Sequence, residues 1–216
     1  MSHHRKVPAA RRQNHSKRWI AIAFMLVLIV FVATAVYVLN ALQNKEPTTH
    51  VTDPAFNAFT QHYLTIMKSL NSTQTKALMA SKLNLGYNQT DIFSWQQSKM
   101  IFVQDATGWY EDPIQILNSG DGICVQWSIV YVSACLALGY QSRLVVAADA
   151  SNWNFIHVWA EDYYKGTWVH VDPSDKVWND PSRYQSWGWG NIGTAVKIYA
   201  FEDGSYQDVT TTYSPH

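Results

Sequence analysis

The sequence contains few cysteines. Only 2 of its 216 residues are cysteine, Cys124 and Cys135, so one chain cannot build a four-thiolate zinc site. If the segment between them is one helix, their Cα atoms lie about 16 Å apart, because each helical residue adds about 1.5 Å. A disulfide requires Cα atoms within about 7 Å of each other. The sequence therefore excludes such a zinc site and predicts two free thiols.

The sequence also lacks net charge, with 16 Lys and Arg against 16 Asp and Glu. Its two parts differ, because residues 1–18 hold six of the basic residues and no acidic residue. The remainder is acidic, which argues against nucleic-acid binding, and we expect no nucleic-acid partner. The basic cluster precedes an apolar segment, which favours a role in membrane topology.

That apolar segment runs from Trp19 to Leu42, and only Thr34 and Asn40 interrupt it. Its length exceeds the roughly 20 residues that span a bilayer as a helix. The positive-inside rule then places the N-terminus in the cytoplasm and the rest of the chain outside it. A cleaved signal peptide is the alternative, because residues 33–35 match a cleavage site, but the apolar run continues past them. We expect a single-pass protein of the cell membrane with an extracytoplasmic domain.

The patterning divides the chain into four segments: a basic head at 1–18, a transmembrane helix at 19–42, a stalk at 43–52 and a domain at 53–216. Helices are expected at about 54–70, 73–83, 91–102 and 124–138. Strands are expected at about 143–148, 155–162, 167–171, 195–201 and 206–213. Helices followed by strands predict an α+β fold with an antiparallel sheet.

The helix at 124–138 carries the first candidate for chemistry. A glycine-rich turn at 120–122 precedes it, Gly139 ends it, and its residues are apolar nearly all round. We therefore expect it to be the buried central helix. Cys124 lies in its first turn, where unpaired N–H groups and the helix dipole favour a thiolate and could stabilise an oxyanion. Cys135 lies in mid-helix and fits a buried structural cysteine.

The strands at 155–162 and 167–171 carry the next two candidates. A loop of two or four residues centred on 164–165 predicts a register in which His157 lies directly opposite Asp172. Their Cβ atoms would then lie about 4.5–5.5 Å apart on one face. A carboxylate there can orient the imidazole, as a catalytic triad requires. His170 is the rival base, but the same register pairs it with Trp159 rather than with an acid.

Together these motifs resemble the transglutaminase-like superfamily of papain-fold thiol enzymes, which includes peptide N-glycanases. The resemblance rests on Gly122-Ile123-Cys124, His157-Val158-Trp159 and Asp172-Pro173, in that order. It implies that Cys124 is the nucleophile, His157 the general base and Asp172 the orienting acid, with the central helix packed on the sheet. No metal or cofactor is needed for this chemistry. The paired CxxC zinc ligands of peptide N-glycanases are missing here.

The resemblance also implies a second oxyanion donor upstream of the cysteine, for which Trp109 and Gln115 are candidates. Aromatic residues are abundant, with 10 Trp and 12 Tyr, as in grooves that bind sugars or extended peptides. The candidates for such a substrate groove are Trp127, Trp159, Trp187 and Trp189. The last two lie in a glycine-rich segment that fits a substrate lid or an ordinary surface loop.

The function that follows is a thiol enzyme acting on amide bonds of a protein or peptide substrate through an acyl-enzyme. Water would resolve the acyl-enzyme in a protease or amidase, and a lysine amine would resolve it in a cross-linking transglutaminase. Hydrolysis is favoured, because nothing in the sequence encodes an acceptor-amine site. A non-catalytic binding module of the cell surface on the same fold is the alternative.

Overall fold

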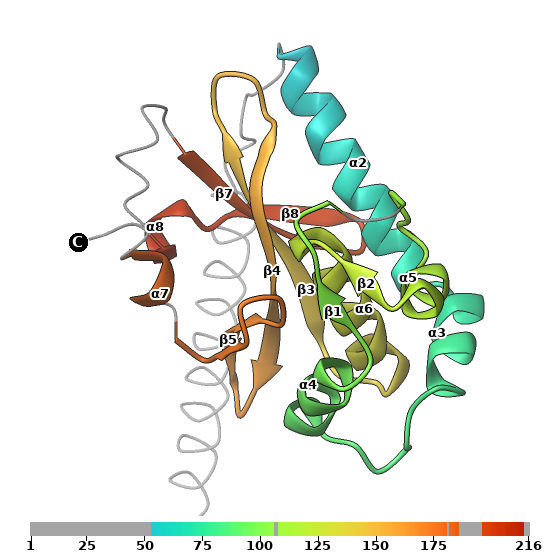
Figure 1. Ribbon diagram of the computed structural model, residues 1–216. Coiled ribbons are helices and arrows are strands. Elements are labelled where there is room, and N and C mark those ends of the chain that lie inside the picture. Colours follow the sequence, from blue (N-terminus) through green and yellow to red (C-terminus); the bar gives the residue numbers. More distant parts are fainter. Residues whose placement is uncertain (1–52, 106–107, 181, 186–195, 214–216) are drawn as a thin grey trace, which may run out of the picture. The chain divides into compact units, whose positions relative to one another are not determined.

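The computed structural model describes residues 53–105, 108–180, 182–185 and 196–213 (Figure 1). All of them lie in one of the two units into which the chain divides, Thr52–His216. The expected basic head, transmembrane helix and stalk lie outside the described residues. The boundaries proposed for those segments therefore stay predictions.

The prediction that this is a membrane-anchored protein with an extracytoplasmic domain is wrong. Among the described residues, no helix combines the length and the apolar character that crossing a bilayer requires. The apolar segment at 19–42, on which the prediction depended, lies outside the described residues.

A layer of helices covers one face of the sheet (Figure 1). Helix α2 begins after Asp53, whose side chain caps the backbone N–H of Ala55, and its buried stripe faces the core. Helix α6 is apolar nearly all round and lies against the sheet as the central buried helix. The helices of this layer are α2 (Pro54–Leu70), α3 (Thr73–Ala80), α4 (Gln89–Gln97), α5 (Pro113–Ser119) and α6 (Cys124–Ala137).

The sheet has six strands in the order β6-β5-β4-β3-β7-β8, and every neighbouring pair is antiparallel. The strands are β3 (Ser142–Asp149), β4 (Phe155–Tyr164), β5 (Thr167–Asp172), β6 (Val177–Trp178), β7 (Val196–Glu202) and β8 (Ser205–Asp208). Two short strands, β1 (Ile101–Phe102) and β2 (Asp121–Gly122), form a separate parallel pair. The predicted α+β class with an antiparallel sheet is confirmed.

Both faces of the sheet are buried. Alternate residues of the strands point to opposite faces, so Val158 packs in the core beneath α6, whereas Trp159 packs in a second core on the far face. The short helices α7 (Ser182–Gln185) and α8 (Thr210–Tyr213) contribute Tyr184 and Tyr213 to that second core. We call this side of the sheet the back layer.

Two predicted elements end five residues earlier than expected. The helix expected to reach Phe102 ends at Gln97, because Ile101 and Phe102 pair with the segment just before Cys124 instead. The strand expected over 206–213 ends at Asp208, whose carboxylate accepts a hydrogen bond from the backbone N–H of Thr210 and starts α8. Both changes bring a segment closer to the candidate site.

Candidate active site

The hairpin of β4 and β5 has a different register from the predicted one. Ala160 pairs with Val171 and Tyr164 with Thr167, so continuing the ladder sets Asp172 level with Trp159 rather than with His157. The reason lies in the turn, which is formed by Lys165 and Gly166 at φ values of 50° and 90°. A two-residue turn of this kind needs positive φ at both positions, and glycine supplies it readily.

His157 and Asp172 nevertheless meet. A strand's side chains alternate between faces with a period of two, and Asp172 is displaced by two positions, so both side chains stay on one face. A bulge in the pairing of β3 with β4, between Ala147 and Ala148, also lies beside His157. His157 Nε2 lies 2.7 Å from Asp172 Oδ2, with His157 only 8% exposed and Asp172 fully buried.

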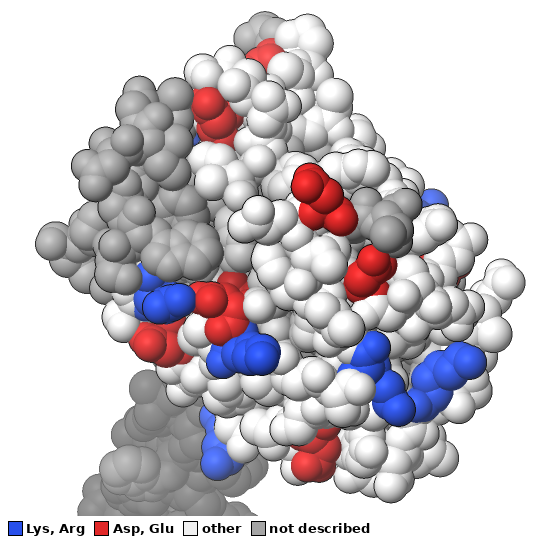
Figure 2. Space-filling view, in the orientation of Figure 1, with Lys and Arg blue, Asp and Glu red and all other residues white. Residues whose placement is uncertain are grey.

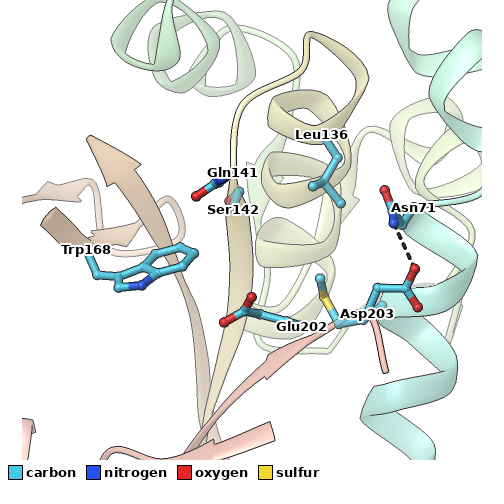
Figure 3. Close-up of a pocket in the computed structure, with 8 residues that line it drawn as sticks. Asn71, Leu136, Gln141, Ser142, Trp168, Glu202 and Asp203 are labelled. Atoms are coloured by element: carbon cyan, nitrogen blue, oxygen red, sulfur yellow. Dashed lines mark hydrogen bonds between the residues drawn. The ribbon is translucent and has the colours of Figure 1, made fainter. Parts of the chain in front are cut away.

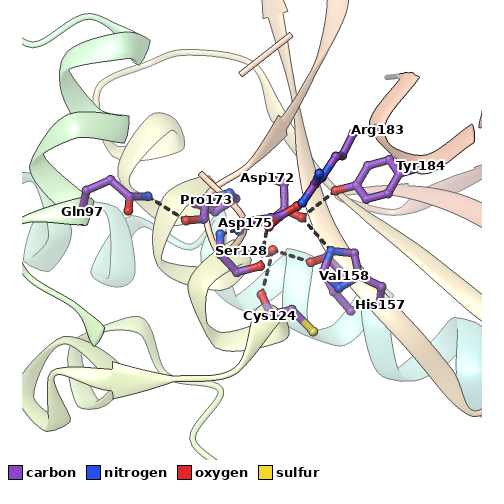
Figure 4. Close-up of polar contacts among 11 residues, drawn as sticks. Gln97, Cys124, Ser128, His157, Val158, Asp172, Pro173, Asp175, Arg183 and Tyr184 are labelled. Atoms are coloured by element: carbon purple, nitrogen blue, oxygen red, sulfur yellow. Dashed lines mark hydrogen bonds and ion pairs between the residues drawn. The ribbon is translucent and has the colours of Figure 1, made fainter. Parts of the chain in front are cut away.

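Asp172 is held through both carboxylate oxygens (Figure 4). Oδ1 accepts hydrogen bonds from the backbone N–H and hydroxyl of Ser174, at 2.9 and 2.7 Å, and from the N–H of Asp175 at 3.0 Å. Oδ2 faces His157 and also accepts a hydrogen bond from the hydroxyl of Tyr184 at 2.6 Å. Burial alone would raise the pKa of Asp172, but these donors lower it to about 2. The carboxylate is therefore ionised at neutral pH.

Cys124 is the first residue of α6, as expected, and is partly exposed. Gln126 shapes this helix start, because its Oε1 accepts from the N–H of Ile123 at 3.0 Å and its Nε2 donates to Gly108 O at 2.7 Å. A Cβ at Gly122 would lie 2.9 Å from Gln126 Cβ, so only glycine allows this close approach. The turn before Cys124 is thus matched to its cap.

The helix start is also tied to the strand that carries His157. The hydroxyl of Ser128 lies within hydrogen-bond distance of Cys124 O, at 2.9 Å, and of Val158 O, at 3.0 Å. Cys124 and His157 line one cavity of about 470 Å³. Helix α6 lies on the helical side of the sheet, whereas the ring of His157 stacks near Trp159 on the other side. The side chains of Cys124 and His157 therefore approach from opposite sides of the sheet and meet near the start of β4.

The electrostatics favour a charged imidazole. Burial lowers the pKa of His157, but hydrogen bonds with Asp172 and Cys124 outweigh it and raise the pKa from 6.5 to about 9. His157 is therefore a cation at neutral pH, and a cation beside a cysteine stabilises its thiolate. Because Nε2 faces Asp172, Nδ1 is the ring nitrogen left for the thiol and the substrate.

The two rivals lie elsewhere. His170 is opposite Glu161, not Trp159, and is buried among the rings of Trp159, Tyr184 and Tyr213. Burial lowers its pKa to about 4, so it is neutral at pH 7. Cys135 is fully buried, and burial raises the pKa of its thiol. Neither residue lines the cavity at Cys124.

Four of the residues predicted from the sequence are not placed where they were expected to act. Trp127 and Trp159 are 2% and 0% exposed, so neither can line a substrate groove, because both fill the two cores. Trp109 and Gln115, the oxyanion candidates, are both exposed and do not line the cavity. Trp187 and Trp189 lie outside the described residues.

Two residues of the site carry no signal in the sequence. Gln104 follows β1 and lines the cavity beside Cys124, which makes its amide the candidate for the second oxyanion donor. Tyr184 donates to Asp172 from α7, twelve positions further along the chain. Both lie in or beside short irregular segments, whose spatial position depends on tertiary packing rather than on a local pattern.

A second cavity of about 270 Å³ lies beside the other end of the sheet (Figure 3). Its acidic groups are already engaged, since Glu202 pairs with Arg143 and Asp203 accepts from the amide of Asn71. The cavity contains neither cysteine nor histidine. Among the described residues, no group of three or more His, Cys, Asp and Glu side chains is arranged to hold a metal ion.

Comparison with known families places this geometry in context. Residues 72–173 match the family described as "Transglutaminase-like superfamily". The chain is 36% identical over 107 residues to a peptide-N(4)-(N-acetyl-beta-glucosaminyl)asparagine amidase of Drosophila melanogaster, covering 49% of this chain and 16% of that protein. An Arabidopsis thaliana protein of the same name is 30% identical over 138 residues, covering 63% of this chain and 18% of its own length. The chain thus spans less than a fifth of either relative.

Among solved structures, the crystal structure of Rad4-Rad23 crosslinked to an undamaged DNA is similar with a TM-score of 0.57. The sequence identity is 13%, and the match covers 74% of this chain and 47% of that one. Rad4-Rad23 bound to a 6-4 photoproduct lesion gives a TM-score of 0.53 at 14% identity, over 71% of this chain and 46% of that one. At such identities the likeness concerns the fold alone.

Proposed function

Because the chain belongs to the transglutaminase-like superfamily, we propose that its domain is a thiol enzyme that acts on amide bonds. The observation that carries the proposal is the chain of contacts from Asp172 through His157 to Cys124. Such a chain supplies an activated nucleophile, an acid and base, and a group that orients the base. The relatives, named as amidases, support an amide as the bond concerned.

In this proposal the thiolate of Cys124 attacks the carbonyl carbon of the amide and forms a C–S bond. The carbonyl oxygen takes up the negative charge, facing the backbone N–H of Cys124 and the amide of Gln104. The C–N bond then breaks, and the leaving nitrogen takes the proton from Nδ1 of His157. A thioester with Cys124 remains. Water, deprotonated by the now neutral His157, attacks the thioester carbon, and the C–S bond breaks. This releases the acid and regenerates the thiolate of Cys124 beside the protonated imidazole.

Asp172 acts through His157 rather than on the substrate. Its carboxylate holds Nε2 and stabilises the imidazolium, which leaves Nδ1 facing the thiol. Its own position is fixed by Ser174, Asp175 and Tyr184. The imidazolium ring therefore stays in position while its proton passes to the leaving nitrogen.

The proposal predicts selective alkylation of one thiol. Limiting iodoacetamide near pH 7, followed by mass spectrometry of the full chain, should label Cys124 at least tenfold faster than Cys135. The reason is that Cys124 is partly exposed beside a cationic imidazole, whereas Cys135 is fully buried. His157→Ala should slow labelling at Cys124, and His170→Ala should leave it unchanged. Equal, slow labelling of both thiols would contradict a catalytic role and favour a binding module.

Hydrolysis and transfer are then separated by the product. With a glutamine peptide and a primary amine present together, a hydrolase releases ammonia and leaves a glutamate. A cross-linking transglutaminase releases ammonia and leaves an amide to the added amine. We favour hydrolysis, because a partly open cavity admits water to the thioester.

A further inference from the structure

One exposed aromatic side chain, Phe102, lines the cavity of Cys124. Phe155 is next in sequence to the lining residue Ile156, and Trp109 packs against Phe155. We call Phe102, Trp109 and Phe155 the aromatic rim. Their exposed fractions are 48%, 74% and 36%. Apolar side chains of this size are usually buried, and a contiguous exposed set marks a binding surface. The two groove candidates in the cores, Trp127 and Trp159, are inaccessible to a bound molecule, whereas these three rings are exposed.

The aromatic rim is continuous with the cavity. Phe102 lines the cavity directly, and Phe155 precedes Ile156, which also lines it. Trp109 packs edge-on against Phe155 with ring centroids 6.3 Å apart. Gln126 fixes the segment before Trp109 by donating to Gly108 O. The three rings therefore lie on three separate segments of the chain, and each segment is bonded to the start of α6 or belongs to β4.

The polar groups of the cavity are largely committed to each other. Ser174 donates its hydroxyl to Asp172, and the carboxylate of Asp175 pairs with Arg183 at 2.7 Å. Of the described residues that line the cavity, apart from Cys124 and His157, this leaves Gln104 as the polar side chain available to a ligand. In Figure 2 the surface over β1 is mostly white, with acidic side chains at its border. An apolar occupant is thus favoured over one that needs many hydrogen bonds.

We propose that the aromatic rim binds aromatic or large aliphatic side chains of a polypeptide, on either side of the amide presented to Cys124. This inference rests on the proposed function, which puts the reacting amide in the cavity. A sugar would need hydrogen bonds to its hydroxyl groups, and two of the three rings, Phe102 and Phe155, offer none. Apolar side chains gain by leaving water against such rings.

The test uses the full chain with Cys124→Ala, which binds without turnover. Fluorescent ten-residue peptides with a central glutamine carry either phenylalanines or serines at the flanking positions, and anisotropy gives each dissociation constant. The phenylalanine peptide should bind at least tenfold tighter, which is about 1.4 kcal/mol. Adding Phe102→Ala or Trp109→Ala should reduce this preference to less than threefold.

Leu85→Ala is the matched control, because Leu85 is a large apolar side chain that is 80% exposed and does not line the cavity. It should leave the preference unchanged. Equal binding of the two peptides would overturn the inference. A serine peptide with an N-acetylglucosaminyl asparagine that binds more tightly, and equally well to the rim variants, would also overturn it in favour of a glycan.

Failure of this inference is distinguishable from failure of the proposed function. If Cys124 of the unmodified protein resists alkylation while Cys124→Ala still prefers the phenylalanine peptide, the rim binds peptides without catalysis. If the thiol is reactive and the peptides bind equally, the enzyme stands and the rim does not serve it.

Discussion

Asp172 is the residue whose surroundings are most fully determined, because donors fill both of its carboxylate oxygens. One of the donors, Tyr184, lies on the four-residue helix α7, and its phenol is fully buried. Its ring packs on Trp159 with centroids 4.5 Å apart, and its hydroxyl reaches Oδ2 beside His157. Tyr184 is therefore a positioning residue, acting on His157 through the carboxylate.

Tyr184→Phe should separate this role from packing, because the ring stays and only the hydroxyl is lost. The carboxylate loses one donor and attracts the imidazolium proton more strongly, so the pKa of His157, about 9 in the native protein, should rise. The basic limb of the kcat/KM profile should move to higher pH. A hydrogen bond to a charged group is worth roughly 1.5–3 kcal/mol, so kcat/KM should fall about tenfold or more.

Tyr213→Phe is the control for that experiment. Tyr213 is an equally buried tyrosine of the back layer, but its hydroxyl donates to Glu161 and not to Asp172. It should lower stability without moving the pH profile. If both variants shift the profile alike, the effect comes from loosened packing and Tyr184 has no positioning role.

Elements with a strong local pattern could be predicted from the sequence. Helix α2, expected at about 54–70, and the apolar α6 with its glycine turn occur where expected. The hairpin register could not, because the choice between Tyr164-Lys165 and Lys165-Gly166 as the turn depends on backbone angles that no hydrophobic pattern encodes. Asp172 still shares a face of the sheet with His157, because the observed register differs from the predicted one by an even number of positions.

The residues around Cys124, His157 and Asp172 are harder to predict. Aromatic character alone makes Trp127 and Trp159 candidates for a substrate groove. Both faces of the sheet are buried, however, and the two side chains fill the two cores. Gln104 and Tyr184 reach the site from irregular or very short segments, which carry no periodicity. Their positions follow from tertiary packing, not from local sequence.

The start of α6 yields a prediction at the scale of an element. Gly122→Ala would place a Cβ 2.9 Å from Gln126 Cβ and 3.2 Å from its Oε1, so the side chain that caps Ile123 must move. We expect a loss of about 1–3 kcal/mol, measured by urea unfolding. Alkylation of Cys124 should slow as well, because the helix start beside it is displaced.

Gly139→Ala is the counterpart at the other end of the helix. Gly139 has a φ of +85° and no atom within 4 Å of a built Cβ, so the substitution costs only backbone strain of about 1 kcal/mol. It should destabilise the protein without slowing alkylation. A Gly122→Ala variant that is stable and fully reactive would show that Gln126 does not organise the site.

At the scale of the whole molecule, three of the buried groups with shifted pKa values, Asp172, His157 and Asp162, make stability depend on pH. Asp172, with its pKa lowered to about 2, stabilises the fold above pH 3.8, and this contribution is lost as pH falls through about 2. His157 stabilises it below pH 6.5, and its contribution is lost as pH rises through about 9. Both contributions to stability are therefore complete between pH 3.8 and pH 6.5.

Asp162 opposes them. It is fully buried between α6 and β4, where Tyr131 donates to it at 2.5 Å, and burial raises its pKa from 3.8 to about 6. Because this pKa is raised in the folded protein, the protonated carboxyl of Asp162 contributes to stability. That contribution is complete below pH 3.8 and is lost as pH rises through about 6. At neutral pH the protein therefore carries a buried carboxylate that costs stability.

Asp162→Asn should relieve that cost, because the amide stays neutral and its oxygen still accepts from Tyr131. By urea unfolding we expect the variant to be more stable than the native chain at pH 7.5, by on the order of 2–3 kcal/mol, and equal to it at pH 4. Asp105→Asn, at an exposed position, should change stability at neither pH. A difference that stays constant between pH 4 and pH 7.5 would refute the role of Asp162.

Cys124 and His157 come from opposite sides of the sheet, and this has a consequence for how the chain acquires thiol reactivity as it folds. An intermediate that has docked α6 but not the back layer would hold Cys124 in place without a fixed imidazole. We expect its thiol to react no faster than a free cysteine. The rate of alkylation during refolding would then rise only when α7 and α8 pack on the sheet. The reactivity of Cys124 would thus report when this last docking step takes place.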